Sequence, residues 1–184
     1  DLSDGVIDTV DTVEVDRHLP VVAEQRLTGV LLAAMRSGEV EVDRPEAVVE
    51  AHERALARAR LLDTAMLESV AILLDADITP CLLRGSAIAR LLPEPDQRIS
   101  GDSDLLGPAD RLDAAASALE AVGATRSRPA ISPDWERRFA PSVTIRRRTG
   151  IELNLHRTLS PGPYGHLIDL DEVVASTVAV EVGG

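Results

Sequence analysis

The chain has 184 residues, of which 45% are hydrophobic, 27% charged and 2% aromatic, and its formal net charge is −12. This composition fits an ordinary folded domain with a buried core and excludes the disordered, collagen-like and disulfide-stapled classes. An acidic chain is a poor partner for duplex nucleic acid, and no apolar stretch approaches the ~20 residues that a membrane span needs.

The N-terminal residues 1–16 contain six acidic residues and no basic one. They lack the basic flank and the apolar run of a secretion signal, so we expect a cytoplasmic protein. Apolar and polar residues alternate from Val6 to Val15. This pattern leaves two alternatives open, a frayed arm or an edge strand.

Helical spacing of apolar residues predicts two helices in the first 78 residues. The first covers residues 19–35 and stops near Gly38, and the second covers residues 45–75. At ~1.5 Å per residue the second helix would be ~46 Å long, which favours a kink or a break within it. We therefore expect residues 1–78 to form an N-terminal arm and a helical segment.

Short strands and turns replace this helical pattern after residue 78. In chain order the sequence predicts a strand, a helix, a strand and a helix over residues 80–84, 87–92, 102–106 and 110–122. The first strand ends at Gly85-Ser86, and Gly123 is the expected C-cap of the last helix. The single cysteine, Cys81, excludes an intrachain disulfide and is expected to be a small buried hydrophobe.

The strongest hairpin signal is Thr149-Gly150, which separates two alternating segments at residues 143–148 and 151–156. A short helix over residues 171–177 and a strand over residues 178–182 follow. Because the sequence stops directly after that strand, we expect the natural chain to continue.

Two aspartates in the strand at residues 102–106 are candidates for a cation site. Strand periodicity places Asp102 and Asp104 on one face and Ser103 on the other. Two carboxylates this close repel each other unless a cation lies between them, and Mg²⁺ prefers such oxygen ligands. The alternative is a solvent-exposed pair of aspartates at a strand end.

Two further segments surround this pair with compatible chemistry. A small-residue turn such as Gly85-Ser86 before a helix can present backbone N–H groups to a phosphate, although it also fits an ordinary tight turn. Alternation in residues 151–156 places Glu152, Asn154 and His156 on one strand face. Taken alone, His156 is more simply a partly buried histidine that donates to a backbone carbonyl.

All 19 basic residues are arginines, and 12 of them lie in residues 79–157. If a polyanion binds, it is expected to bind this middle segment, where phosphate oxygens accept bidentate contacts from arginine. The alternative is that these arginines form a solvent-exposed face that binds no polyanion.

Three motifs in this order resemble the uncharacterised nucleotidyltransferase family of the polymerase-beta-like superfamily. They are Leu82-Leu83-Arg84-Gly85-Ser86-Ala87-Ile88, Arg98-Ile99-Ser100-Gly101-Asp102-Ser103-Asp104-Leu105-Leu106 and Gly150-Ile151-Glu152-Leu153-Asn154-Leu155-His156-Arg157. The resemblance implies an α+β fold for residues 79–184, with a small mixed or antiparallel sheet flanked by helices.

The resemblance also implies catalysis with two Mg²⁺ ions and a nucleoside triphosphate such as ATP. Its implied catalytic residues and metal ligands are Asp102, Asp104 and Glu152. Gly85 and Ser86 would hold the phosphates, and the implied phosphate-neutralising residues are Arg84 and Arg98.

Three positions depart from the family pattern. Arg84 stands where a lysine is expected, and the polar Ser103 stands where an apolar residue is usual. The third metal-binding carboxylate of the family can be aligned with this sequence in two ways, which place either Glu152 or Asn154 at its position.

The resulting hypothesis is a Mg²⁺-dependent nucleotidyltransferase that transfers a nucleoside monophosphate to an unidentified acceptor. The alternative is a non-catalytic nucleotide-binding or antitoxin-like interaction module that retains the fold. In that case Asn154 would bind the nucleotide without supplying the charge of a carboxylate.

Overall fold

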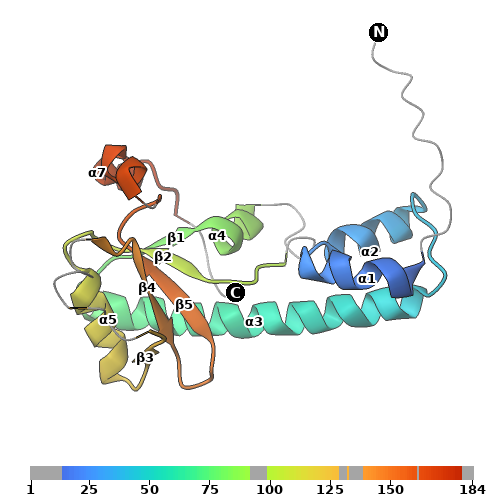
Figure 1. Cartoon of the computed structure of the whole chain (residues 1–184), viewed down its shortest axis with the longest axis horizontal. Coiled ribbons are helices and arrows are strands. Elements are labelled where there is room, and N and C mark those ends of the chain that lie inside the picture. The colour runs from blue at the N-terminus through green and yellow to red at the C-terminus, as the bar shows by residue number, and fades with distance from the viewer. Residues whose placement is uncertain (1–13, 92–98, 129–131, 133–138, 161, 180–184) are drawn as a thin grey trace, which may run out of the picture. The chain divides into compact units, whose positions relative to one another are not determined.

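The computed structural model describes residues 14–91, 99–128, 132, 139–160 and 162–179 (Figure 1). The helices are α1 (Val15–Glu24), α2 (Thr28–Ser37), α3 (Pro45–Asp75), α4 (Arg84–Leu91), α5 (Leu112–Ala121) and α7 (Leu170–Ala175), with a 3-10 helix η2 (Gly162–Leu167). The strands are β1 (Cys81–Leu83), β2 (Asp104–Leu106), β3 (Thr125–Arg126), β4 (Ser142–Arg146) and β5 (Glu152–His156). Within these described segments no helix combines the length and the apolar character that a membrane crossing requires.

The chain divides into two compact units, residues 1–59 with 92–101 and residues 60–91 with 102–184. The expected organisation into residues 1–78 and 79–184 stays a prediction.

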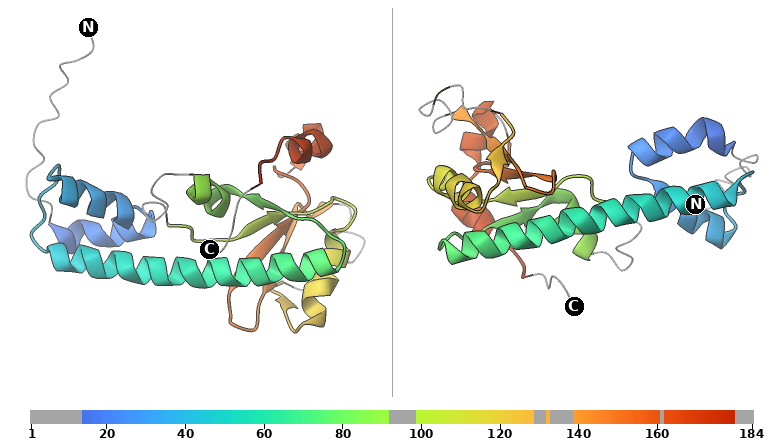
Figure 2. Two further views of the ribbon diagram at one scale, coloured as in Figure 1. Left: turned by 180° about the vertical axis from the view of Figure 1, so that it is seen from behind. Right: turned by 90° about the horizontal axis from the view of Figure 1, so that it is seen from below.

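In the first unit, α1 and α2 lie beside the N-terminal part of α3 (Figure 2). The prediction of one helix over residues 19–35 is wrong, because Arg26 adopts a left-handed conformation with φ 62° and ends α1. The N–H of Leu27 donates to the carbonyl of Val22 across this break. In contrast, α3 is continuous over the predicted residues 45–75, without a break.

The second unit contains a five-stranded mixed sheet in the order β1-β2-β5-β4-β3. Strands β2 and β5 are parallel, and the other pairs are antiparallel. The predicted hairpin is confirmed as β4 and β5, with Gly150 at φ 82° in the connecting turn. This arrangement of helices and a small mixed sheet confirms the predicted α+β class.

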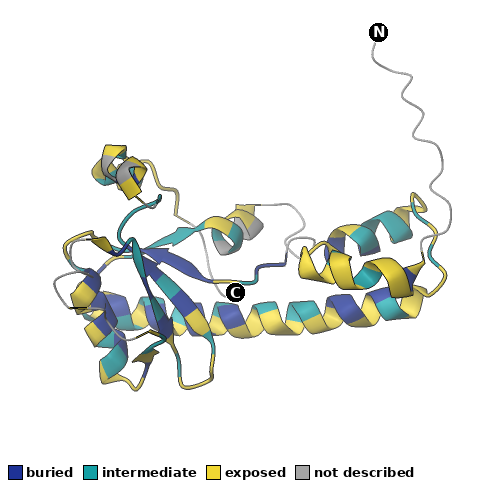
Figure 3. Cartoon of the chain, viewed as in Figure 1, coloured by how far each residue is buried: buried dark blue, intermediate teal, exposed yellow. Residues whose placement is uncertain are grey.

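One face of this sheet is the core face. Its leucine, isoleucine and valine side chains pack against the second half of α3 and against α5. Figure 3 colours the buried positions of these elements dark blue. The cluster includes Met66, Leu73, Leu105, Leu119, Ile145, Leu153 and Leu155. Because side chains alternate along a strand, the residues between these leucines lie on the opposite face. That opposite face carries Asp104, Thr144, Asn154 and His156.

Two local predictions need correction and one is confirmed. Helix α4 begins at Arg84, so Gly85-Ser86 lies in its first turn and not in a separate loop before it. Residues 178 and 179 are not in a strand, and the rest of the strand predicted there lies outside the described residues. Gly123 does follow the C-terminus of α5 with φ 90°, and its N–H donates to the carbonyl of Glu120.

Candidate functional site

Asp104 is the centre of the polar face of the sheet. It is the first residue of β2, and its neighbours in register are Leu83 on β1 and Asn154 on β5. The residue is only 2% exposed. A carboxylate can be buried in this way only if hydrogen-bond donors replace the water that it loses.

Three side chains supply those donors. Asn154 Nδ2 donates to Asp104 Oδ1 over 3.0 Å, and His156 Nε2 lies 2.9 Å from the same oxygen. Since an ionised carboxylate only accepts hydrogen bonds, this contact requires His156 to carry its proton on Nε2. Arg84 Nη1 lies 3.4 Å from the other oxygen, Oδ2. His156 therefore bonds to a carboxylate and not, as expected, to a backbone carbonyl.

Thr144 completes this network from β4. Its hydroxyl donates to Asn154 Oδ1 over 2.8 Å, so the amide oxygen of Asn154 accepts from Thr144 while its amino group faces Asp104. The sequence analysis did not select Thr144. The hairpin turn contained the necessary signal, because pairing Arg146 with Glu152 across it aligns Thr144 with Asn154.

Arg84 approaches Asp104 from the junction of β1 and α4. It has φ 57°, a left-handed conformation that is unusual for an arginine and costs on the order of 1 kcal/mol. Its side chain is 59% exposed, whereas that of Asp104 is buried. The first turn of α4 also contains Gly85, and the N–H groups of a first helical turn have no intrahelical acceptor. Arg98 and the side chain of Ser86 lie outside what the structure describes.

Asp102 precedes β2, which begins two residues later than predicted. The N–H of Asn154 donates to the carbonyl of Ser103 over 2.8 Å, so the pairing with β5 extends one residue before the strand. Asp102 is exposed, whereas Asp104 is buried. The two aspartates thus differ in their surroundings, one open to solvent and one enclosed by donors.

Glu152 lies at the edge of the hairpin with other partners. Its Oε1 accepts from Ser127 Oγ at 2.7 Å and from Arg146 Nη2 at 2.7 Å. These bonds, first that of Ser127 and then that of Arg146, lower the pKa of Glu152. Thus Asn154 and His156 are the residues of β5 that bond to Asp104, whereas Glu152 bonds elsewhere. In the described residues no group of three histidine, cysteine, aspartate or glutamate side chains is arranged to hold a metal ion.

The Glu152 carboxyl is expected to titrate below its ordinary value of 4.5, and Ser127→Ala should raise its pKa because the hydroxyl is the largest cause of the shift. A lowered pKa stabilises the fold at pH values above the unfolded pKa, and that stabilisation disappears as pH falls through the folded pKa. The stability difference between wild type and Ser127→Ala should therefore shrink below pH 4.5. Carbon-13 NMR titration of the side-chain carboxyl measures the pKa directly. An unchanged titration curve in Ser127→Ala would contradict this assignment, and Ser37→Ala serves as a control that should leave Glu152 unaffected.

Ser103 lies on the core face beside this site and is 1% exposed. Its Oγ has no hydrogen-bond partner among the described residues. Removing an unsatisfied hydroxyl avoids its desolvation cost, so Ser103→Ala should raise the free energy of unfolding by about 1 kcal/mol. Ser69→Ala is the matched control, because the equally buried Ser69 Oγ donates to the carbonyl of Ala65 over 2.7 Å. Urea denaturation would contradict the prediction if Ser103→Ala were the less stable of the two variants.

One of the comparisons with known proteins, that with family models, agrees with the family that the three sequence motifs resemble. A family model described as uncharacterised nucleotidyltransferase matches residues 11–184, which confirms the resemblance seen in the sequence. No curated protein and no solved structure matches the chain significantly. The match covers the Asp104 network and every residue that the sequence analysis selected.

Proposed function

The chain belongs to the uncharacterised nucleotidyltransferase family, and from this membership we propose that it transfers a nucleoside monophosphate from a Mg²⁺-bound nucleoside triphosphate to an acceptor. The observation that carries the proposal is the buried carboxylate of Asp104, covered by Arg84 at the first turn of α4. A buried negative group beside an exposed positive one, next to the N–H groups of a first helical turn, suits a cation together with phosphates.

The donor set fits one Mg²⁺ ion that arrives with its nucleotide. A carboxylate offers about four lone-pair positions, and the contact that Asp104 Oδ2 makes within the described residues is a long one of 3.4 Å from Arg84. Mg²⁺ is commonly held by one or two carboxylates and completed by phosphate oxygens and water, so Asp102 and Asp104 would be sufficient. When bound there, Mg²⁺ would draw negative charge from the phosphate oxygens. A second ion and the participation of Glu152 stay predictions.

The residues of the chain would contribute binding and orientation. Asn154 and His156 hold the Asp104 carboxylate at a fixed orientation through Oδ1. Arg84 would leave Asp104 when a cation takes its place, and its guanidinium would then bind phosphate oxygens in a bidentate manner. Gly85, without a side chain, allows phosphates to approach the N–H groups of α4.

The transfer would form one bond and break one. A nucleophilic oxygen or nitrogen of the acceptor would bond to the α-phosphorus, and the bond from that phosphorus to the bridging oxygen of the β-phosphate would break. Pyrophosphate would leave with the electron pair, and the acceptor proton would pass to solvent. The charge that develops on the leaving group is what Arg84 would stabilise.

Transfer of label from α-³²P-labelled triphosphates tests the proposal across a panel of acceptors, in Mg²⁺ and in Mn²⁺. We expect Asp102→Asn to lower turnover about 100- to 1,000-fold, since it removes a charged group at the reacting phosphates. Asp110→Asn, an exposed aspartate in the turn after β2, is the matched control and should keep its activity. Absence of turnover by the wild type with both metals, or full activity of Asp102→Asn, would refute the proposal.

One observation favours a second candidate function, a non-catalytic nucleotide-binding module. Asn154 fills the position beside Asp104 with a neutral amide, and that amide donates to the carboxylate. Calorimetric titration of ATP with and without Mg²⁺ separates the two functions. The transferase should bind metal and nucleotide cooperatively, whereas the module should bind ATP with an affinity indifferent to Mg²⁺.

A further inference from the structure

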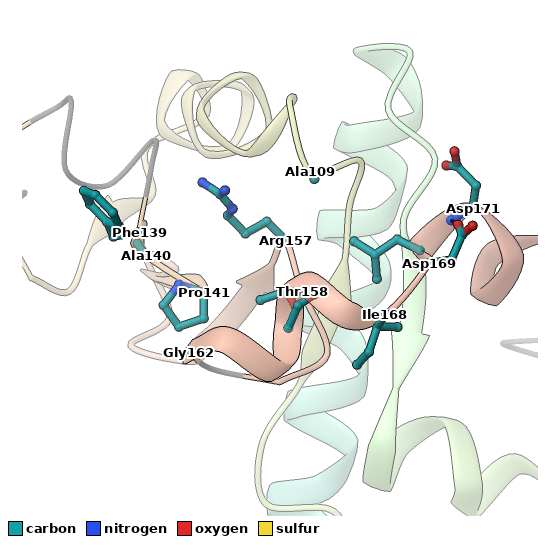
Figure 4. A pocket seen from close by; sticks show the side chains of 12 residues that line it. Ala109, Phe139, Ala140, Pro141, Arg157, Thr158, Gly162, Ile168, Asp169 and Asp171 are labelled. Carbon is teal, nitrogen blue, oxygen red and sulfur yellow. Dashed lines mark hydrogen bonds between the residues drawn. The ribbon is translucent and has the colours of Figure 1, made fainter.

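A cavity of about 670 Å³ lies in the second unit, where several strands begin or end. Its lining includes Ala140 and Pro141 just before β4, Arg157 and Thr158 just after β5, and residues of η2 and α7 (Figure 4). This volume is within the range of small-molecule sites, ~300–1,000 Å³. None of the side chains that bond to Asp104 lines it, so it is distinct from the site described above.

Among the described residues that line the cavity, Arg157 is the positively charged one. The half-buried Arg157 extends its guanidinium into the cavity toward the side where Phe139 and Ala109 lie (Figure 4). A guanidinium offers five N–H donors in a planar fork, which matches the two oxygens of an acidic group. An acidic group of a ligand would therefore bind at this end.

The walls beside Arg157 are apolar. Phe139 is the single phenylalanine of a chain that is only 2% aromatic, yet it is 64% exposed at this cavity. An exposed aromatic ring beside a concave surface is typical of a ligand contact. Pro141, Ile168 and Leu170 extend the apolar lining, so the body of the ligand would be a ring or an aliphatic chain.

The opposite end carries negative charge. Asp169 and Asp171 lie there, away from Arg157 (Figure 4). The carboxylate of Asp169 accepts from the N–H groups of Asp171 and Glu172 and so caps α7. Two carboxylates would repel a second acidic group, and the ligand would therefore carry its acidic group at one end only.

Close packing joins two segments of the cavity wall. A Cβ atom on Gly165 would collide with the carbonyl oxygen of Ser160 and with Thr158 Oγ1. Thr158 Oγ1 also bonds to the carbonyl oxygens of Ser160 and Gly165, at 3.3 and 3.2 Å. These contacts join the segment after β5 to η2. The shape of the cavity is thus present before any ligand arrives.

From this arrangement we propose that the cavity binds a small organic monoacid with an apolar or aromatic body, its acidic group on Arg157 and its body against Phe139 and Ile168. The proposal does not depend on nucleotidyl transfer. It adds a second ligand site to the chain, beyond the end of the two parallel strands β2 and β5.

NMR titration of the ¹⁵N-labelled full chain without nucleotide tests the site, with 4-phenylbutanoate as the acidic probe and 4-phenylbutan-1-ol as its neutral counterpart. We expect the acid to shift the amide signals of Ala109, Thr158 and Leu170 and to bind at least tenfold more tightly than the alcohol. Arg157→Ala should remove this difference, while Arg58→Ala, on the exposed surface of α3, should preserve it.

Arg157→Gln provides a second variant of similar size should the alanine variant fold poorly, and its amide spectrum reports the fold independently. Equal affinities for acid and alcohol, or a preference for the acid that survives in a folded Arg157 variant, would overturn the proposal. Addition of ATP and Mg²⁺ should leave the probe bound. Displacement of 4-phenylbutanoate by ATP would overturn the assignment of a separate site, whereas a lack of transferase activity would leave it intact.

Discussion

Replacing Asp104 by alanine is expected to lower the free energy of unfolding by about 3 kcal/mol. The carboxylate is enclosed, and its loss leaves the donors of Asn154 and His156 without their acceptor at a largely buried position. Arg84 contributes less to this cost because its exposed guanidinium regains water. Urea denaturation followed by circular dichroism measures the change.

Asp102→Ala is the matched control for this experiment. Asp102 is two residues away and exposed, so the same substitution should change the free energy of unfolding by about 1 kcal/mol or less. If both variants lost the same stability, the buried network around Asp104 would not be a main stabilising element. Under the proposed function both variants should still lose turnover, which separates the contribution of each aspartate to stability from its contribution to catalysis.

Asn154→Asp is expected to make the stability of the protein depend on Mg²⁺. The substitution places a second carboxylate against Asp104, where the amide now donates 3.0 Å from Oδ1. Two adjacent carboxylates repel each other, so the metal-free variant should be less stable by about 2 kcal/mol. A divalent cation would relieve the repulsion, and Mg²⁺ bound at 100 times its dissociation constant would restore about 2.7 kcal/mol.

Thermal denaturation in EDTA and in Mg²⁺ measures this dependence. Asn154→Ala is the control, because it removes the same hydrogen bonds but adds no charge, and Mg²⁺ should not restore its stability. Manganese binding followed by electron paramagnetic resonance should show at least a tenfold gain in affinity for Asn154→Asp over wild type. If Mg²⁺ affected the aspartate and alanine variants equally, position 154 would not face a cation site.

Much of the second unit could be predicted because its signals are local. Alternation with a period of two determines which face of a strand each residue occupies, and it correctly separated Leu153 and Leu155 from Asn154 and His156. The Thr149-Gly150 turn predicted the hairpin from adjacent residues. The apolar stripe of residues 110–122 and Gly123 similarly determined α5 and its end.

Other features could not be predicted from local pattern. Arg26 and Arg84 adopt left-handed backbone conformations that sequence reasoning assigns to glycine, and these two residues determine where α1 ends and where α4 begins. The energetic cost of such a conformation in an arginine is offset by contacts made elsewhere in the fold.

The sequence by itself determined the α+β class, the family and the polar faces of β2 and β5, since each depends on residue order within short segments. Only the tertiary structure decided that Asn154 bonds to Asp104 while Glu152 bonds to Ser127 and Arg146. That outcome depends on the register between two parallel strands about 50 residues apart. A register shift of two residues keeps every side chain on its face, so alternation along a strand does not distinguish one register from the other. The packing of the whole unit selects among the registers.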